Sequence, residues 1–166
     1  MFERLNTPEE LFSYKLGAAL KMENTVLEML GDLEENSTRE ELKQQFRHHA
    51  DETREQIQNI EQSFEALGQE PDDSPCPAIE GLEKEGKANI KKTDDTLVDN
   101  VILSGAAETE HHEIAMYETL IAHADGLAEH DVARLLRENL EQERHALGEV
   151  QRLMRAALEQ LAGHTR

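Results

Sequence analysis

Hydrophobic residues recur at every third or fourth position over four long stretches of the chain, with polar residues between them. This period is typical of helices that turn one face toward a core. The prolines are confined to position 8 and to positions 71–77, so the stretches contain no internal proline and little room remains for strands. The pattern predicts helices over about residues 8–34, 39–67, 95–124 and 129–161, and a shorter helix over about 77–92.

Local signals at the helix ends support these boundaries. Thr7-Pro8-Glu9-Glu10 and Thr38-Arg39-Glu40-Glu41 each place a glutamate three positions after a threonine, which is the pattern of a capping box. Gly68 and Asp125-Gly126 follow long hydrophobic stretches and are typical of helix ends. The turn-rich residues 68–75 then form the main loop.

The four long helices fall into two helix-turn-helix hairpins, one on each side of the proline-rich stretch. Two such hairpins need one long crossover, which contains the short helix. The sequence therefore predicts an all-α fold, an antiparallel four-helix bundle with one additional short helix in the crossover. A chain of 166 residues suits a single domain, so we expect residues 1–166 to form one.

Charge and composition exclude several classes of partner. The chain has 36 Asp and Glu against 17 Lys and Arg, a net charge of −19. Such a surface repels phosphates and anionic lipids, so we expect neither nucleic acid nor a membrane as a partner. Cys76 is the single cysteine, no stretch approaches the roughly 20 apolar residues that span a bilayer, and the first residues lack the pattern of an export signal. We expect a cytoplasmic protein.

Charged residues interrupt the hydrophobic faces of all four long helices. The interrupting residues are Glu23 in 8–34, His49 with Glu52 at the edge of the face in 39–67, Glu113 with Glu110 one turn earlier in 95–124, and Glu143 in 129–161. An unpaired buried carboxylate costs several kcal/mol or takes up a proton, so converging carboxylates indicate a cation between them. Carboxylate and imidazole ligands favour a hard or borderline divalent metal such as iron or manganese.

The sequence resembles the ferritin-like superfamily and, within it, the YciF/YciE-like branch of small stress-associated bacterial bundles. The resemblance covers about residues 8–160 and rests on His49-Ala50-Asp51-Glu52-Thr53, Cys76-Pro77-Ala78-Ile79-Glu80-Gly81-Leu82 and Glu110-His111-His112-Glu113-Ile114-Ala115. It implies a homodimer with a stress-related role and a site for two divalent metal ions, iron in the first place and manganese as the alternative. It also implies ligand roles for Glu23, Glu52, Glu110, Glu113 and Glu143, with His49 as a further candidate.

Many ferritin-like sites use two Glu-x-x-His pairs, and this sequence departs from that pattern. Glu52 is followed three positions later by another glutamate and Glu143 by an alanine, while the single Glu-x-x-His, Glu108-x-x-His111, falls toward the polar side of its helix. His112 also stands where the branch has tyrosine. The sequence therefore leaves open whether the protein is an enzyme, with a di-iron oxidase or ferroxidase-like reaction if it is one, and which residues and redox partner would serve it.

Two other interpretations remain open at this stage. In the first, the protein is a metal-free structural or interaction bundle whose inner glutamates are protonated or bridged by water. In the second, it is a cation buffer that binds metals only through its acidic surface. Tyr14 and Tyr117 are expected to be core or interface residues with their hydroxyls hydrogen-bonded. Cys76, at the junction of the loop with the short helix, is expected to be a small buried residue.

Overall fold

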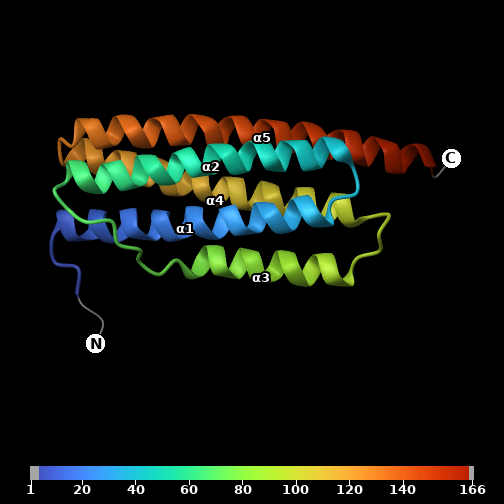
Figure 1. Ribbon diagram of the computed structural model, residues 1–166, viewed down its shortest axis with the longest axis horizontal. Coiled ribbons are helices and arrows are strands. Elements are labelled where there is room, and N and C mark those ends of the chain that lie inside the picture. Colours follow the sequence, from blue (N-terminus) through green and yellow to red (C-terminus); the bar gives the residue numbers. More distant parts are fainter. Residues whose placement is uncertain (1–3, 165–166) are drawn as a thin grey trace.

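The computed structural model describes residues 4–164 as an all-helical bundle (Figure 1). Its helices are α1 (Pro8–Asn36), α2 (Glu40–Ala66), α3 (Pro77–Lys92), α4 (Val98–Gly126) and α5 (His130–His164). The described residues include no strand, which confirms the all-α prediction and the order of four long helices and one short one. Residues 1–3 and 165–166 of the expected domain lie outside the described part.

The four long helices pack as two hairpins, α1 with α2 and α4 with α5. Contacts of α2 with α5 and of α1 with α4 close the bundle, and α3 lies outside it against α1 and α4 (Figure 1). Each long helix contributes fully buried side chains to one continuous core, among them Leu16, Leu42, Ile102 and Leu136. The core therefore runs along the axis of the bundle, between the four long helices.

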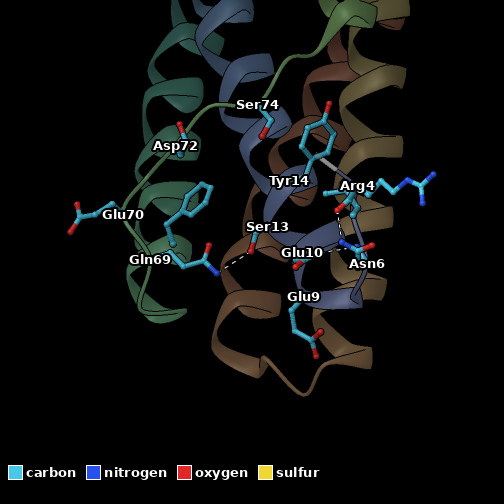
Figure 2. Close-up of a pocket in the computed structure, with 12 residues that line it drawn as sticks. Arg4, Asn6, Glu9, Glu10, Ser13, Tyr14, Gln69, Glu70, Asp72 and Ser74 are labelled. Carbon is cyan, nitrogen blue, oxygen red and sulfur yellow. Dashed lines mark hydrogen bonds between the residues drawn. The ribbon is translucent and has the colours of Figure 1, made fainter. Parts of the chain in front are cut away.

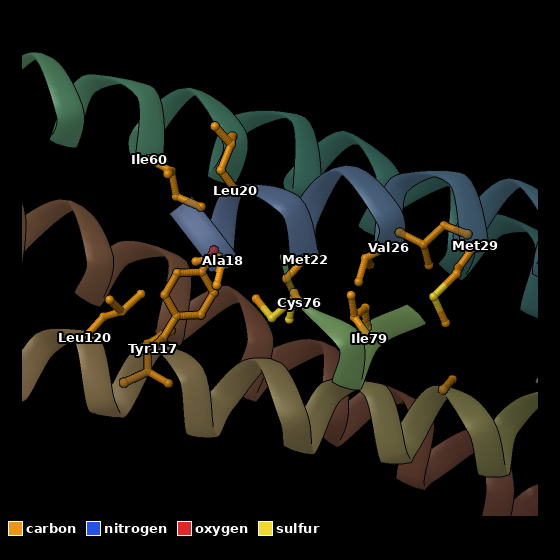
Figure 3. Packing of buried hydrophobic residues seen from close by; sticks show 14 of the residues in the cluster. Ala18, Leu20, Met22, Val26, Met29, Ile60, Cys76, Ile79, Tyr117 and Leu120 are labelled. Atoms are coloured by element: carbon orange, nitrogen blue, oxygen red, sulfur yellow. The ribbon is translucent and has the colours of Figure 1, made fainter. Parts of the chain in front are cut away.

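Helix α1 is buried on more sides than its sequence pattern predicts. The predicted face runs through Phe12, Leu16 and Leu20, yet Met22 and Val26 are also buried. Figure 3 shows both in the buried cluster together with Cys76 and Ile79, which lie at the start of α3. Because α3 covers a second flank of α1, a single hydrophobic stripe underestimates what this helix buries.

The first helix starts as the sequence predicts. The hydroxyl of Thr7 accepts a hydrogen bond from the backbone N–H of Glu10 at 3.1 Å. The Glu10 carboxylate in turn accepts from the backbone N–H of Asn6 at 2.7 Å. Two side chains thus accept from backbone N–H groups at this helix end, as in a capping box, although the second donor is Asn6 and not Thr7.

The capping box predicted at Thr38 is wrong. Helix α2 begins after Arg39, and no side chain caps it. The backbone N–H and the hydroxyl of Thr38 instead donate to the Asp99 carboxylate at 2.8 and 2.7 Å, and Arg39 Nε donates to it at 2.9 Å. One charged carboxylate thus accepts from both donors of Thr38 and from Arg39, so a contact distant in sequence replaces the local one.

The remaining helix ends differ from prediction by small shifts. Gly68 has a φ of 70° and ends α2 in the left-handed conformation, as expected. After α4 the left-handed residue is Ala128, with a φ of 61°, and not a glycine. Helix α4 begins at Val98 rather than near 95, because residues 94–97 form a turn closed by a 2.8 Å hydrogen bond between Leu97 N and Asp94 O.

The crossover from α2 to α3 passes closely over α1 at Gly17. A Cβ atom at this position would lie 2.6 Å from Ser74 Oγ and 2.7 Å from the carbonyl oxygen of Asp72. Farther along the same face, Gln69 Nε2 donates to Ser13 Oγ at 3.0 Å (Figure 2). The crossover and the start of α1 line the surface pocket of Figure 2. Close approach at Gly17 therefore helps to place the crossover, and with it α3, beside the bundle.

Candidate metal centre

The four long helices bring a group of charged side chains into the core near the middle of the bundle. Glu23, Glu113 and Glu143 are fully buried, while His49 and Glu110 are 2% and 4% exposed. The fold brings them there because each occupies a core-facing position of its helix, at the helical spacing that the surrounding hydrophobic residues share. Glu52, at the edge of its helix face, keeps 15% of its side chain exposed.

Four of these residues converge on one point. His49, Glu110, Glu113 and Glu143 each offer a ligand atom, and the four atoms lie within 4.8 Å of one another. His49 Nε2 is 3.3 Å from Glu110 Oε1 and 3.6 Å from Glu143 Oε2. Ligand atoms around one divalent ion stand about 3 to 4 Å apart, because each lies roughly 2.1 Å from the metal. The spacing in this group therefore suits a single ion between the four residues.

Several of the buried carboxylate oxygens have no hydrogen-bond partner. Both oxygens of Glu113 and of Glu143 are in this state, as are Oε2 of Glu110 and Oε2 of Glu23. Buried polar atoms without partners are rare because leaving water without compensation is costly. A cation at the point of convergence would remove that cost. The donor set, carboxylate oxygens with one imidazole nitrogen, fits a hard or borderline divalent metal.

Burial and mutual repulsion shift the pKa values of the group. Burial raises the pKa of Glu23 to about 7, although the hydrogen bond from Tyr117 opposes the shift. Burial, followed by the neighbouring carboxylates, raises the pKa of Glu113 and of Glu143 well above 4.5. Burial lowers the pKa of His49, but the carboxylates around it, Glu110 first, outweigh burial and raise it well above 6.5. The metal-free group therefore retains protons that a metal ion would displace.

Glu52 lies at the edge of the group and contacts the other side of the His49 ring. Its Oε2 is 3.2 Å from His49 Nδ1, and its Oε1 is 3.4 Å from His48 Nε2. A carboxylate that holds one ring nitrogen directs the other nitrogen, here toward Glu110 and Glu143. In this geometry Glu52 orients a candidate ligand and is not among the four convergent atoms.

Glu23 also stands beside the group of four. The Tyr117 hydroxyl donates a hydrogen bond to Glu23 Oε1, and Tyr117 is fully buried with its hydroxyl bonded, as the sequence predicts. Tyr14, of which the sequence predicts the same, is 39% exposed and does not belong to the core. The charge of Glu23 nevertheless acts on Glu113 and on Glu143, and it contributes to the raised pKa of both carboxyls. Of the six predicted ligands, four therefore converge and two, Glu23 and Glu52, lie next to them with hydrogen-bond partners of their own.

Comparison with known proteins identifies the family. The chain matches, over residues 7–162, a family model described as a domain of unknown function, DUF892. The chain belongs to the DUF892 family. Protein YciF of Escherichia coli K12 is 33% identical over 142 residues, which cover 84% of this chain and 86% of YciF. The expected resemblance to the YciF-like branch of helical bundles is thereby confirmed.

Solved structures of relatives share the fold of this DUF892 protein. The crystal structure of the E. coli stress protein YciF superposes with a TM-score of 0.88 at 28% identity, covering 93% of this chain and 99% of that one. YcfI of Rhodopseudomonas palustris gives a TM-score of 0.87 at 36% identity, covering 91% and 98%. The chain is thus a YciF-type helical bundle, and no helix among residues 4–164 is long and apolar enough to cross a membrane.

Sequence reasoning missed the polar residues next to the DUF892 site. Asn139 is fully buried, and its Nδ2 donates to the Tyr117 hydroxyl oxygen and to the backbone oxygen of Gln56, both at 3.1 Å. Gln56 is fully buried as well. The signal was present in the spacing: Asn139 lies four positions before Glu143 and Gln56 four after Glu52, one turn away on the same helix faces.

Two other sequence predictions concern residues outside the site. The Glu108-x-x-His111 pair is exposed at both ends, as predicted from its polar position. Cys76 is buried, as expected of a small core residue, and its Sγ is 3.9 Å from His112 Nε2. Neither feature adds a ligand to the convergent group.

Proposed function

We propose that this DUF892 protein binds two divalent metal ions, iron in the first place and manganese as the alternative, inside its helical bundle, and that it has a stress-related role. The observation that carries the proposal is the group of buried carboxylates, foremost Glu113 and Glu143, whose oxygens have no hydrogen-bond partner and face His49. The stress-related part rests on the relative YciF, which is described as a stress protein.

Charge balance favours two ions over one. Glu23, Glu52, Glu110, Glu113 and Glu143 supply as many as five negative charges, against at most one positive charge on His49. Two divalent ions nearly neutralise five carboxylates, whereas one ion leaves several buried charges uncompensated. We place the first ion between the four convergent residues. For the second ion we propose Glu23, whose Oε2 has no partner, and Glu52 as further ligands.

Bound iron would supply one-electron redox chemistry toward oxygen or peroxide. The chain's own residues would exclude water from the site and orient its ligands. Full burial of Glu113 and Glu143 keeps bulk water away, and Glu52 orients the His49 ring through Nδ1. Di-iron oxidase or ferroxidase-like activity is the enzymatic form of this proposal.

The test is the metal content of the purified protein after anaerobic loading with Fe(II) and desalting. We expect about two irons per chain in the wild type and none retained in Glu143→Ala, because Glu143 contributes two oxygens without partners. Glu141→Ala, on the exposed face of the same helix, is the matched control and should keep both irons. A wild type that retains no metal contradicts the proposal, and metal that persists in Glu143→Ala but is lost with added salt indicates surface binding instead.

A metal-free structural role is the second candidate, because the relative YcfI is provisionally described as a structural protein. Glu143→Leu separates the two. A structural bundle should keep or gain stability, since a buried polar group without a partner is replaced by an apolar one. A metal protein should lose the stabilisation that added metal gives the wild type. Urea unfolding with and without Mn(II) measures both effects.

We also propose that the protein is a homodimer. Light scattering coupled to size-exclusion chromatography should then give twice the chain mass of 18.8 kDa. A mass equal to that of one chain at micromolar concentration would contradict this part and leave the intra-bundle metal site unaffected, because all of the convergent ligands come from one chain.

A further inference from the structure

The two oxygens of the Glu23 carboxylate are in different states. Oε1 accepts the hydrogen bond of the Tyr117 hydroxyl, whereas Oε2 is buried and has no partner. Tyr117 is itself fully buried, so this contact is protected from competition by water. The chain therefore holds one oxygen of Glu23 and leaves the other free.

The direction of that hydrogen bond is fixed by Asn139. Its side-chain amide nitrogen donates to the Tyr117 hydroxyl oxygen at 3.1 Å, so this oxygen acts as an acceptor there and its single proton remains for Glu23. Asn139 is held in turn, because its Oδ1 accepts from Asn59 Nδ2 at 2.7 Å and its Nδ2 also donates to the Gln56 backbone oxygen. Residues of α2 therefore fix the orientation of the Asn139 side-chain amide, which belongs to α5.

Glu23 is absent from the group of four residues whose ligand atoms lie within 4.8 Å. His49, Glu110, Glu113 and Glu143 are gathered without it and do not depend on Tyr117 for a hydrogen bond. A first ion therefore finds its ligands in place, while Glu23 approaches with a single free oxygen from α1.

We infer that Tyr117, fixed by Asn139, is a positioning residue that presents Glu23 as a one-oxygen ligand to the second metal ion and has no part in binding the first. This inference rests on the proposed two-metal function and deepens it. Partners that orient a metal ligand typically contribute 10- to 100-fold to metal affinity. The inference therefore assigns unequal affinities to the two ions and gives Tyr117 control of the weaker one.

The experiment is an anaerobic titration of the full chain with Co(II), followed by calorimetry and by the visible absorption of the bound ion. The wild type should bind two ions in two resolved steps. Tyr117→Phe, which keeps the ring, should weaken the second step about tenfold or more and change its absorption spectrum, and it should leave the first step within about twofold. Tyr14→Phe removes an exposed hydroxyl near the start of α1 and is the control.

A second variant tests the same chain of contacts. Asn139→Ala should weaken the second step in the same direction, because the Tyr117 hydroxyl loses the donor that orients it. The double variant should be no weaker than Tyr117→Phe alone, since both substitutions remove one linked arrangement. Circular dichroism checks that each variant keeps its helices. If Tyr117→Phe does not fold, the Asn139→Ala variant alone tests the inference.

The outcomes separate this inference from the proposed function. Two ions in the wild type with an unchanged or tighter second step in Tyr117→Phe overturn the inference and leave the proposed function standing. A wild type that binds a single ion overturns the inference and the two-ion part of the proposed function, because no second step exists, and leaves metal binding inside the bundle standing. A wild type that binds no Co(II) and no Fe(II) overturns the proposed function together with the inference.

Discussion

At the scale of the residue, the site consists of acids that are costly to bury and that the protein buries nonetheless. Glu113 has two oxygens without partners in a position with no solvent exposure. A leucine there would leave the stability of the fold unchanged or raise it, since replacing buried ionic groups with well-packed apolar residues is often neutral or stabilising. Helices α1, α4 and α5 each bury an acid with partner-free oxygens, and α2 adds the buried His49. A bound cation, as proposed above, would offset this cost.

The stability of the metal-free protein should fall as the pH rises from 5 to 8. The carboxyl of Glu23 has an ordinary pKa of 4.5 when the chain is unfolded and about 7 when it is folded. The folded state therefore binds more protons, and the stability that this gives is lost as the pH rises through the folded pKa. His49, whose pKa is also raised, acts in the same direction. Glu23 alone corresponds to about 3 kcal/mol over this range.

Urea unfolding in the presence of a chelator, at pH 5, 6, 7 and 8, measures this trend. Saturating Mn(II) should flatten it, because a bound ion takes the place of the protons. Glu23→Gln should reduce the slope in the chelated protein, whereas Glu28→Gln on the exposed face of α1 should leave it unchanged. A stability that rises between pH 5 and pH 8 would show that the buried acids are not protonated in the folded state.

At the scale of the element, the fold depends on two contacts that link segments distant in sequence. One is the close passage of the crossover over Gly17, and the other is the Asp99 carboxylate of α4, which holds the residues before α2. Neither is visible in the hydrophobic pattern. The first sets where α3 lies, and the second determines where α2 starts.

Gly17→Ala should destabilise the protein by about 1 to 3 kcal/mol, the usual cost of overpacking. The added Cβ would meet the Asp72 carbonyl oxygen at 2.7 Å, a backbone atom that moves only with the crossover. Gly31→Ala, in the same helix with nothing within 4 Å of its Cβ, should stabilise the protein by about 0.5 to 1 kcal/mol. Thermal unfolding of both variants gives the comparison. Equal changes in stability would contradict the close passage of the crossover over Gly17.

Asp99→Asn should cost about 1.5 to 3 kcal/mol, because hydrogen bonds to a charged carboxylate are among the stronger ones. Burial raises the pKa of Asp99, but its hydrogen bonds with Thr38 and Arg39 outweigh burial and lower it, so the carboxylate is charged at neutral pH. Asp95→Asn, in the exposed turn before α4, is the control and should change the unfolding free energy by less than about 0.5 kcal/mol. A cost for Asp99→Asn no larger than that of the control would argue against this link.

Most of the fold was predictable from the sequence because it depends on periodicity and helix-end signals, which are local. Thr7 caps α1 as expected, while Thr38 does not cap α2 because Asp99, 61 positions away, takes its hydrogen bonds. The burial of Glu23, Glu113 and Glu143 in the core was likewise predictable from helix faces. Periodicity gives no distances between helices, so it did not distinguish the four convergent ligands from Glu23 and Glu52.

At the scale of the whole molecule, the site joins parts of the chain that the crossover separates. His49 comes from the first hairpin, and Glu110, Glu113 and Glu143 come from the second. A metal ion bound between them would link the two hairpins across the bundle. The acidic surface, with its net charge of −19, would also draw cations toward the molecule from outside.

The most direct measurement is a crystal structure of the iron-loaded protein with anomalous diffraction data collected at the iron edge. We predict one anomalous peak between His49, Glu110, Glu113 and Glu143, and a second peak beside it within reach of Glu23 Oε2. Ordered helices with these side chains in place and no anomalous peak inside the bundle would contradict the central claim, and would favour the metal-free structural protein.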